Sequence, residues 1–254
     1  MLISYPGPLL VVTAVEPEAD AVRAGLTGRG GPAAPGAPAA PGAPAAPGAP
    51  AAPGASAART DVVVAVVGVG SAEAAAGTAR LLALAEAAGR RYAAVLSVGI
   101  GGGLPGRAAV GDTVIATRSV AADLGADSPD GYLPIERLGF GNSTAVADDG
   151  LSASLRAALP GAPAGDVLTV NTVTGTAARA AELAARHPAA LAEAMEGYGV
   201  AVAARAAGLP FAELRTISNP VGPRDRAAWN LPAAFTALTA AFTALRTSRP
   251  PSPR

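Results

Sequence analysis

The sequence predicts an α/β fold, in which a central mixed, mostly parallel β-sheet is flanked by helices. Short apolar runs rich in valine alternate with longer segments of helical composition along the chain. The short runs are apolar at consecutive positions, which is typical of strands that are buried on both faces. The chain has 254 residues, 50% of them hydrophobic, which is enough for one compact domain.

Each expected element follows from one of these runs. The expected strands are residues 9–15, 62–67, 93–100, 113–117, 167–172 and 211–218. The expected helices are residues 18–26, 72–88, 151–158, 177–186, 189–207 and 232–245. Glu16, Pro17 and Glu18 suit the start of the first helix, because proline and acidic residues are favoured in a first turn. The segment 110–114 reads as a turn into the fourth strand.

Two segments have compositions that do not support a packed core. Between residues 32 and 55 the hexamer Pro-Ala-Ala-Pro-Gly-Ala repeats without any large apolar side chain. Such a repeat predicts an extended surface loop. We therefore expect a single domain over residues 1–245, with a disordered insertion at about 28–58 and a disordered tail at 246–254.

Composition excludes several classes of function. The 19 basic and 19 acidic residues give a net charge of zero without a basic stripe, so we expect no nucleic-acid partner. The chain has no cysteine and a single histidine, His187, which we interpret as a surface cap; we expect no metal and no cofactor. The first residues lack the pattern of a signal peptide and no long run of large apolar residues occurs, which predicts a cytoplasmic protein without a membrane partner.

Ligands of open α/β sheets bind beyond the carboxyl ends of the strands, so the residues after each run are candidates for the site. Glu16 and Glu18 follow the first strand, and they either complement the helix dipole or include a general base. Gly68 and Gly70 follow the second strand, but Glu73 replaces the third glycine of a dinucleotide fingerprint. A nicotinamide enzyme is therefore only a minor alternative.

A run of glycines follows the third expected strand. Residues 99–104 read Gly-Ile-Gly-Gly-Gly-Leu. The missing side chains allow either a tight turn or the close approach of a flat ligand to the backbone. The sequence leaves both interpretations open.

Acidic and polar residues also stand out late in the chain. Glu193, Met195 and Glu196 fall within the expected helix 189–207, which is otherwise rich in Ala and Val. An acid on such an apolar face needs an arginine partner or a ligand, because an unpaired buried carboxylate is very costly. The last strand ends in Arg-Thr-Ile-Ser-Asn at 215–219, at the edge where ligands bind.

The order of these motifs resembles that of the purine nucleosidase and phosphorylase superfamily. The resemblance is carried by the acid pair after the first strand, by GIGGGL, by AMEGYG at 194–199 and by RTISN at 215–219. It covers residues 9–245 apart from the insertion. The sequence is most similar to the nucleosidases that cleave methylthioadenosine and, within that group, to the futalosine hydrolases of menaquinone biosynthesis. The resemblance implies a nucleoside phosphorylase-like fold and an N-glycosyl hydrolase that releases hypoxanthine.

The resemblance also implies a role for individual residues. Glu18 would activate the attacking water, Arg215 would help to hold it, and Asn219 would handle the departing purine. Glu196 would bind the two ribose hydroxyls while Met195 packs on the sugar face. The further substrate contacts that it implies are Ala14, Gly102, Ala178 and Ser218.

Asn219 departs from the methylthioadenosine nucleosidases, which carry Asp at this position. A protonated Asp can donate to N7 of a 6-aminopurine. An Asn amide can instead donate to a 6-oxo group and accept from N7–H, which favours a hypoxanthine leaving group. Trimeric purine phosphorylases of this fold also use Asn, so this residue does not decide between hydrolysis and phosphorolysis.

The charge after the first strand predicts the type of reaction. Phosphorylases of the superfamily place glycine and arginine there, whereas this chain has Glu16 and Glu18. Carboxylates repel phosphate and can accept a proton from water. We therefore expect hydrolysis of a small-molecule purine nucleoside through an oxocarbenium-like state. The alternatives are a purine nucleoside phosphorylase, a methylthioadenosine-type nucleosidase and a non-catalytic nucleoside-binding protein.

The aromatic residue that stacks on the base is not evident from the motifs. Relatives place an aromatic after a Gly-Asp-Ala-Phe motif, where this chain has Gly-Thr-Ala-Ala at 175–178. Tyr198, Phe140 and Trp229 are the candidates for this role. The superfamily forms dimers, so we expect a homodimer or a higher homo-oligomer.

The 5′ arm of the substrate also needs a partner. Futalosine carries a benzoate there, and Arg224 or Arg226 is the candidate to bind its carboxylate. A surface salt bridge with Asp225 is the alternative explanation for the same two arginines.

Overall fold

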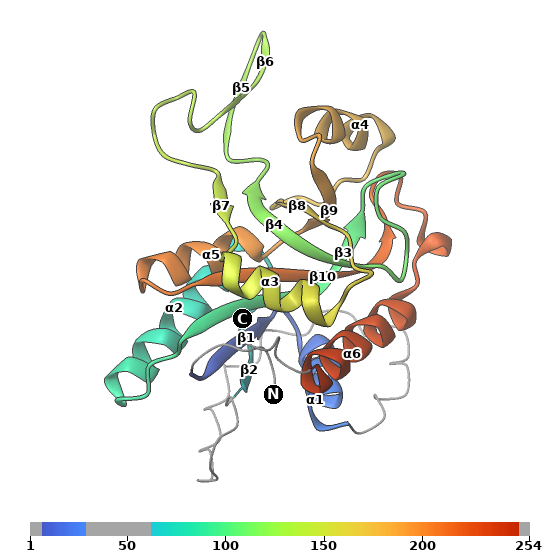
Figure 1. The fold of residues 1–254 in the computed structure, drawn as a ribbon. Coiled ribbons are helices and arrows are strands. Elements are labelled where there is room, and N and C mark those ends of the chain that lie inside the picture. Colours follow the sequence, from blue (N-terminus) through green and yellow to red (C-terminus); the bar gives the residue numbers. More distant parts are fainter. Residues whose placement is uncertain (1–6, 29–61, 249–254) are drawn as a thin grey trace.

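The structure, a computed structural model, describes residues 7–28 and 62–248 (Figure 1). The expected insertion lies outside these residues except for Gly28, which ends the first helix in a left-handed conformation with φ 68°. Within the described ranges, no helix is both long enough and apolar enough to cross a bilayer.

An eight-stranded sheet forms the centre of the molecule. Its strands are β1 (Leu9–Thr13), β2 (Val62–Val66), β3 (Ala94–Gly103), β4 (Thr113–Ala121), β7 (Thr144–Val146), β8 (Ala164–Thr169), β9 (Ala190–Ala194) and β10 (Phe211–Pro220). The strands follow the order β10-β4-β8-β9-β3-β1-β2, with β7 paired to β4. Because β10 also pairs with β3, the strands β3, β10, β4, β8 and β9 close into a ring, from which β1 and β2 extend as an open sheet.

Most strand pairs are parallel, as the sequence predicts. The pairs β1–β2, β1–β3, β3–β10, β4–β8 and β8–β9 are parallel, whereas β10–β4, β3–β9 and β4–β7 are antiparallel. The prediction of an α/β fold with a mixed, mostly parallel sheet is confirmed. A separate hairpin of β5 (Gly125–Ser128) and β6 (Gly131–Pro134) projects from the ring, and neither it nor β7 was predicted.

Helices cover both faces of the open sheet. The helices are α1 (Glu16–Thr27), α2 (Ser71–Ala87), α3 (Asp149–Ala158), α4 (Ala177–Arg186), α5 (Gly197–Ala206), α6 (Leu231–Thr247) and a short 3-10 turn, η1 (Arg226–Ala228). Leu9 and Val11 of β1 pack in a core with α1 and α6, whereas Leu10 and Val12 pack in a second core with α2 and α5. This alternation explains why the first strand is apolar at every position.

One expected helix is wrong in its first part. Residues 190–194 form β9 rather than helix, and α5 begins only at Gly197. The composition of this segment favours a helix, but β8 and β3 both pair with it and bury the side chains of Ala190, Ala192 and Ala194. Tertiary pairing therefore overrides the local propensity.

The glycine run lies inside β3 rather than after it. At Gly99, an added Cβ would lie 2.6 Å from a carboxylate oxygen of Glu18 and 2.8 Å from Nη1 of Arg215. The missing side chain thus admits two other side chains of the protein. The run is neither a tight turn nor, at this position, a direct approach of backbone to ligand.

The end of the chain also differs from the expectation. The tail was expected from residue 246, but α6 continues through Thr247, and Nε of Arg246 donates to the carbonyl of Gly25 at 3.1 Å. Residues 249–254 lie outside the described residues.

Candidate active site

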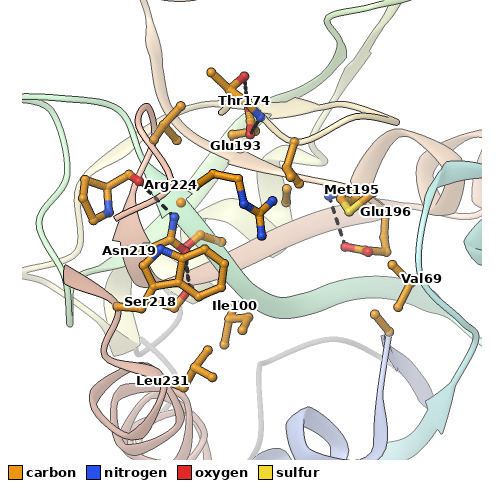
Figure 2. A pocket seen from close by; sticks show the side chains of 18 of the residues that line it. Val69, Ile100, Thr174, Glu193, Met195, Glu196, Ser218, Asn219, Arg224 and Leu231 are labelled. Atoms are coloured by element: carbon orange, nitrogen blue, oxygen red, sulfur yellow. Dashed lines mark hydrogen bonds between the residues drawn. The ribbon is translucent and has the colours of Figure 1, made fainter. Parts of the chain in front are cut away.

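A cavity of about 280 Å³ opens at the carboxyl ends of β1, β3 and β10 (Figure 2). Its polar lining combines residues from distant parts of the chain: Glu18, Thr174, Glu193, Glu196, Ser218, Asn219, Arg224 and Trp229. Ala14, Gly102 and Met195 also line it. The structure therefore brings together most of the residues that the sequence singled out.

Glu18 lies in the first turn of α1 and is only 3% exposed. One carboxylate oxygen accepts hydrogen bonds from the backbone N–H groups of Ala14 (2.9 Å) and Val15 (3.3 Å), and the other accepts from that of Ile100 (2.9 Å). Burial raises the pKa of the Glu18 carboxyl, although these hydrogen bonds and the charge of Arg215 oppose the shift. A rigidly held carboxylate with a raised pKa is suited to act as a general base.

Glu16, the other acid of the pair, points away from the cavity. It is exposed and forms an ion pair with Arg23 at 2.9 Å. Only Glu18 of the two acids reaches the site.

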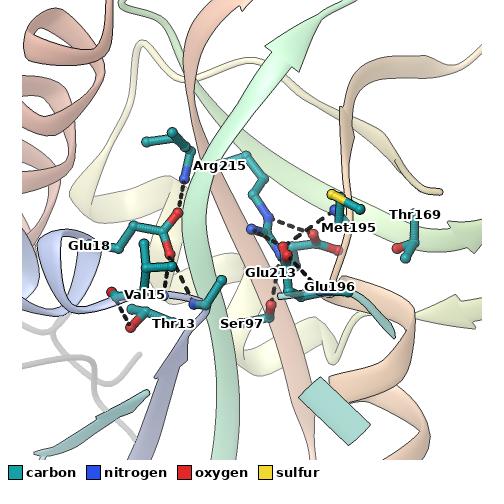
Figure 3. A network of polar contacts seen from close by, with 12 residues as sticks. Thr13, Val15, Glu18, Ser97, Thr169, Met195, Glu196, Glu213 and Arg215 are labelled. Atoms are coloured by element: carbon teal, nitrogen blue, oxygen red, sulfur yellow. Dashed lines mark hydrogen bonds and ion pairs between the residues drawn. The ribbon is translucent and has the colours of Figure 1, made fainter. Parts of the chain in front are cut away.

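Glu196 lines the same cavity as Glu18 and lies at the start of α5, and both acids belong to the polar network drawn in Figure 3. Its Oε1 accepts from the backbone N–H of Gly70 at 3.2 Å, and its Oε2 accepts from that of Met195 at 3.3 Å. Oε2 also forms an ion pair with Nη1 of Arg215 at 3.0 Å. Gly70, part of the rejected dinucleotide motif, thus orients an acid of the site.

Arg215 lies behind the cavity wall on β10 and is 1% exposed. Its guanidinium contacts three side chains: Glu196, Glu213 (Nε to Oε1, 2.8 Å) and Ser97 (Nη2 to Oγ, 3.0 Å). Burial alone would lower the pKa of Arg215, but the adjacent carboxylates hold it above the ordinary arginine value. Arg215 is not among the residues that line the cavity, so its contacts place it as a support for Glu196.

Glu213 is a member of this network that the sequence analysis missed. It is fully buried, accepts a hydrogen bond from the Ser119 hydroxyl, and pairs with Arg215. Burial raises the pKa of the Glu213 carboxyl against the opposing charge of Arg215. Residues two apart on a strand share a face, so an acid two positions before Arg215 in an apolar strand was the available signal.

Asn219 follows a bulge near the end of β10. Its Oδ1 accepts from the Ser218 hydroxyl at 2.8 Å, and its Nδ2 donates to the carbonyl of Pro220 at 3.0 Å. The Ser218 hydroxyl also lies 3.2 Å from the carbonyl oxygen of Gly101. The amide is therefore fixed in one orientation at the mouth of the cavity.

Glu193 faces the same cavity from β9, with 5% exposure. Oε1 accepts from the backbone N–H of Thr174 at 2.8 Å, and Oε2 accepts from the Thr174 hydroxyl at 2.5 Å. Burial raises the pKa of the Glu193 carboxyl, and the hydrogen bonds from Thr174 oppose this. Its partner is thus a threonine rather than an arginine.

Trp229 is the one of the three aromatic candidates that lines the cavity. The Tyr198 side chain is buried elsewhere, with its hydroxyl donating to the carbonyl of Asn142, and Phe140 is 81% exposed away from the lining residues. Ala178 is exposed on α4 and is not among the lining residues either.

Of the two arginines after β10, only Arg224 reaches the cavity. Its guanidinium lies over the indole of Trp229, 5.4 Å from the ring centroid. Asp225 caps η1 through the backbone N–H of Ala227 instead of pairing with either arginine in the described residues. Arg226 lies in η1 and is exposed.

His187 lies outside the cavity, at the end of α4. Its backbone N–H donates to the carbonyl of Leu183 at 2.9 Å, which confirms its position as a cap. The ring is half-buried rather than at the surface, and burial lowers the pKa of this histidine.

Comparison with known proteins places the chain in a family. A family model described as "Phosphorylase superfamily" matches residues 54–245. The chain is 56% identical over 172 residues to a futalosine hydrolase of Streptomyces coelicolor, covering 68% of this chain and 73% of that protein. It is 47% identical over 240 residues to a futalosine hydrolase of Acidothermus cellulolyticus, covering 93% of this chain and 89% of that protein.

The fold is also similar to that of a solved structure. The futalosine hydrolase of Helicobacter pylori superposes with a TM-score of 0.70 over 94% of this chain and 97% of that one, at 16% identity. This structural likeness supports the fold, and the two closer sequence matches carry the family assignment. The chain belongs to the phosphorylase superfamily and, within it, to the futalosine hydrolase family.

Proposed function

We propose that this protein hydrolyses the N-glycosidic bond of futalosine, releasing hypoxanthine and dehypoxanthine futalosine in menaquinone biosynthesis. The observation that carries the proposal is the pair of buried carboxylates, Glu18 and Glu196, that line one cavity. Two relatives that are 56% and 47% identical to this chain over the aligned residues bear the name of the same activity.

Glu18 activates the water. In its ionised form the carboxylate accepts a proton as the water oxygen bonds to C1′ of the ribose. The three backbone N–H groups keep the carboxylate fixed, so little reorganisation is needed during the reaction. The electron pair of the C1′–N bond leaves with the purine, which takes up a proton from solvent at N7, and the proton accepted by Glu18 returns to solvent.

Glu196 binds the ribose, and Arg215 positions Glu196. Two carboxylate oxygens can accept hydrogen bonds from two adjacent sugar hydroxyls. Arg215 occupies one lone pair of Oε2 and compensates the charge of Glu196, which would otherwise be costly to bury. Met195 lies beside Glu196 in the cavity wall and packs on the sugar.

Asn219 stabilises the departing purine. Its amide supplies one further N–H to the 6-oxo group, and its carbonyl has a further lone pair for N7–H. Ala14, Gly102 and Ser218 complete the substrate contacts.

Trp229 and Arg224 bind the outer parts of the substrate. The indole offers a flat apolar surface for a ring of the substrate. Arg224 has no acidic partner among the described residues, so its guanidinium is available for the carboxylate on the 5′ arm.

Exposed apolar side chains support a homodimer or a higher homo-oligomer. Phe140 is 81% exposed and Val146 of β7 is 72% exposed. Pairing with a second copy of the chain would bury such side chains, and the burial of their apolar surface would favour association. Sedimentation equilibrium at micromolar concentration should give at least twice the mass of 24.5 kDa, whereas a monomer would contradict this part of the proposal.

The experiment that tests the reaction is release of the purine base from futalosine, inosine and methylthioadenosine, each with and without phosphate: hypoxanthine from the first two substrates and adenine from the third. We expect release from futalosine at a rate that phosphate does not change. Release from inosine only in the presence of phosphate would instead make the protein a phosphorylase. Absence of release from all three would leave a nucleoside-binding protein.

A further inference from the structure

Glu193 has no part in the water, ribose or N7 contacts described above, yet it faces the same cavity (Figure 2). A 5% exposed carboxylate beside a ligand cavity needs a reason to be there, because burial of a charge is costly. Thr174 satisfies only part of its capacity: an ionised carboxylate has about four acceptor positions, and Thr174 uses two. The remaining acceptor positions are available to a ligand.

The register of three strands aligns Glu193 with Asn219. In the sheet, Glu193 of β9 pairs with Gly102 of β3, and Gly102 pairs in turn with Asn219 of β10. Glu193 and Asn219 therefore stand two strand spacings apart, about 9–10 Å between their backbones, on either side of a glycine. Directly paired residues project to the same face of a sheet.

Gly102 lies between these two residues in the sheet, and its missing side chain makes room for Val221 and for the amide of Asn219. An added Cβ at this position would lie 3.3 Å from Nδ2 of Asn219 and 2.8 Å from Cγ2 of Val221. All four residues line the same cavity, whose wall here combines the apolar side chain of Val221 with the amide of Asn219 at one end of the paired row and the carboxylate of Glu193 at the other. A planar heterocycle can bind in this part of the cavity with its polar edge facing both the amide and the carboxylate.

We infer that Glu193 is a specificity-determining residue, whose carboxylate accepts the N1–H of a 6-oxopurine while Asn219 binds the O6 and N7 side. The inference rests on the proposed function and deepens it. A 6-oxopurine carries a proton on N1, whereas N1 of a 6-aminopurine is an acceptor. A carboxylate facing N1 thus attracts hypoxanthine and repels adenine.

The hydrogen bonds from Thr174 determine whether the side chain at position 193 offers the ligand an acceptor or a donor. Both carboxylate oxygens act as acceptors from Thr174, one from a backbone N–H that cannot reverse its polarity. In the variant Glu193→Gln, the backbone N–H of Thr174 would still donate to the carbonyl oxygen of the glutamine side chain. The NH₂ group would then take the position that Oε2 has in the native protein. The variant should therefore present a donor where the native protein presents an acceptor.

Calorimetric binding of free bases tests this without relying on hydrolysis. The native protein should bind hypoxanthine at least about 10-fold more tightly than adenine or 1-methylhypoxanthine, which lacks the N1 proton. Glu193→Gln should weaken hypoxanthine binding about 10- to 100-fold, the value of one hydrogen bond to a charged group, and leave adenine binding unchanged or tighter.

Two further variants serve as controls. Glu182→Gln makes the same chemical change on the exposed face of α4, where the side chain pairs with Arg179, and should alter neither affinity. Thr174→Val removes only the hydroxyl that orients Glu193. It should reduce the ratio of hypoxanthine affinity to adenine affinity by a smaller factor than Glu193→Gln does. If Glu193→Gln does not fold, as judged by circular dichroism, Thr174→Val carries the test.

Several outcomes would overturn the inference. These are equal changes in hypoxanthine and adenine affinity in the folded variant, no change in either, or no hypoxanthine binding by the native protein. Failure of the proposed function looks different: futalosine would remain intact while the preference for hypoxanthine over adenine, and its loss in Glu193→Gln, persist.

Discussion

The floor and the rim of the cavity are built differently. Glu18 and Glu196 on the floor, with Glu213 and Arg215 directly behind it, are each at most 7% exposed, and their charged atoms have protein partners. At the rim, Arg224 is exposed and contacts the half-buried indole of Trp229, and Val69 and Val173 are 53% and 41% exposed. The floor is thus organised before any ligand binds, whereas the rim gains partners from the ligand. Substitutions on the floor should therefore change kcat and the free energy of unfolding, whereas substitutions at the rim should change KM for the substrate.

The largest effect is expected for Glu18→Gln. The amide cannot accept the proton of water, so kcat should fall by about 10²- to 10⁴-fold, the usual contribution of a general base. Steady-state kinetics with futalosine measure this, and Glu16→Gln is the matched control because Glu16 is exposed and pairs only with Arg23. Equal losses in the two variants would contradict the assignment of the base to Glu18.

Arg215→Met tests whether the floor depends on its one buried cation. Removal of the guanidinium leaves Glu196 and Glu213 without their charged partner, which should lower the free energy of unfolding by about 3–5 kcal/mol. Urea unfolding at pH 7 measures this. Arg23→Met removes an exposed pair and should change the same quantity by about 0.5 kcal/mol or less. A similar small change for Arg215→Met would show that the network is not a supporting structure.

At the rim, Arg224→Met should act on affinity alone. We expect KM for futalosine to rise about 5- to 10-fold with little change in kcat, because one exposed ion pair contributes about 1 kcal/mol. Arg226→Met is the control, since Arg226 does not line the cavity. A fall in kcat for Arg224→Met, or an equal rise in KM for both variants, would place the 5′ arm elsewhere.

The smallest effect concerns pH. Burial raises the pKa of Glu18 above the ordinary value of 4.5, and the base must be ionised to accept a proton. Activity should therefore fall as the pH drops through this raised pKa, and the acid limb of the kcat/KM profile should lie above pH 4.5. A limb at or below that value would indicate that burial does not control the titration of this group.

The sequence was sufficient to predict many of the residues that line the cavity. Continuous apolar runs predicted the strands, and the polar residues that follow them, Glu18 and Asn219, do meet in one cavity with Glu196. These predictions succeed because the alternation of strand and helix determines which ends of the strands share an edge.

What the sequence could not supply depends on pairing between distant segments. Residues 190–194 have a helical composition and become strand β9 only because β3 and β8 lie on either side. The register that places Glu193 opposite Gly102 follows from that pairing. The burial of Glu213 beneath Gly197, where an added Cβ would collide with its carboxylate, likewise depends on tertiary packing.

The closure of five strands into a ring has a consequence for how such enzymes can diverge. Glu18 and Glu196, assigned to water and ribose, lie at the starts of α1 and α5, whereas Glu193, Gly102 and Asn219 lie where β3, β9 and β10 meet in the ring. Substitutions of Glu193 or Asn219 can change which base is released while both helix starts, and Arg215 behind Glu196, are inherited intact. The fold thereby allows leaving-group preference to evolve separately from the reaction itself.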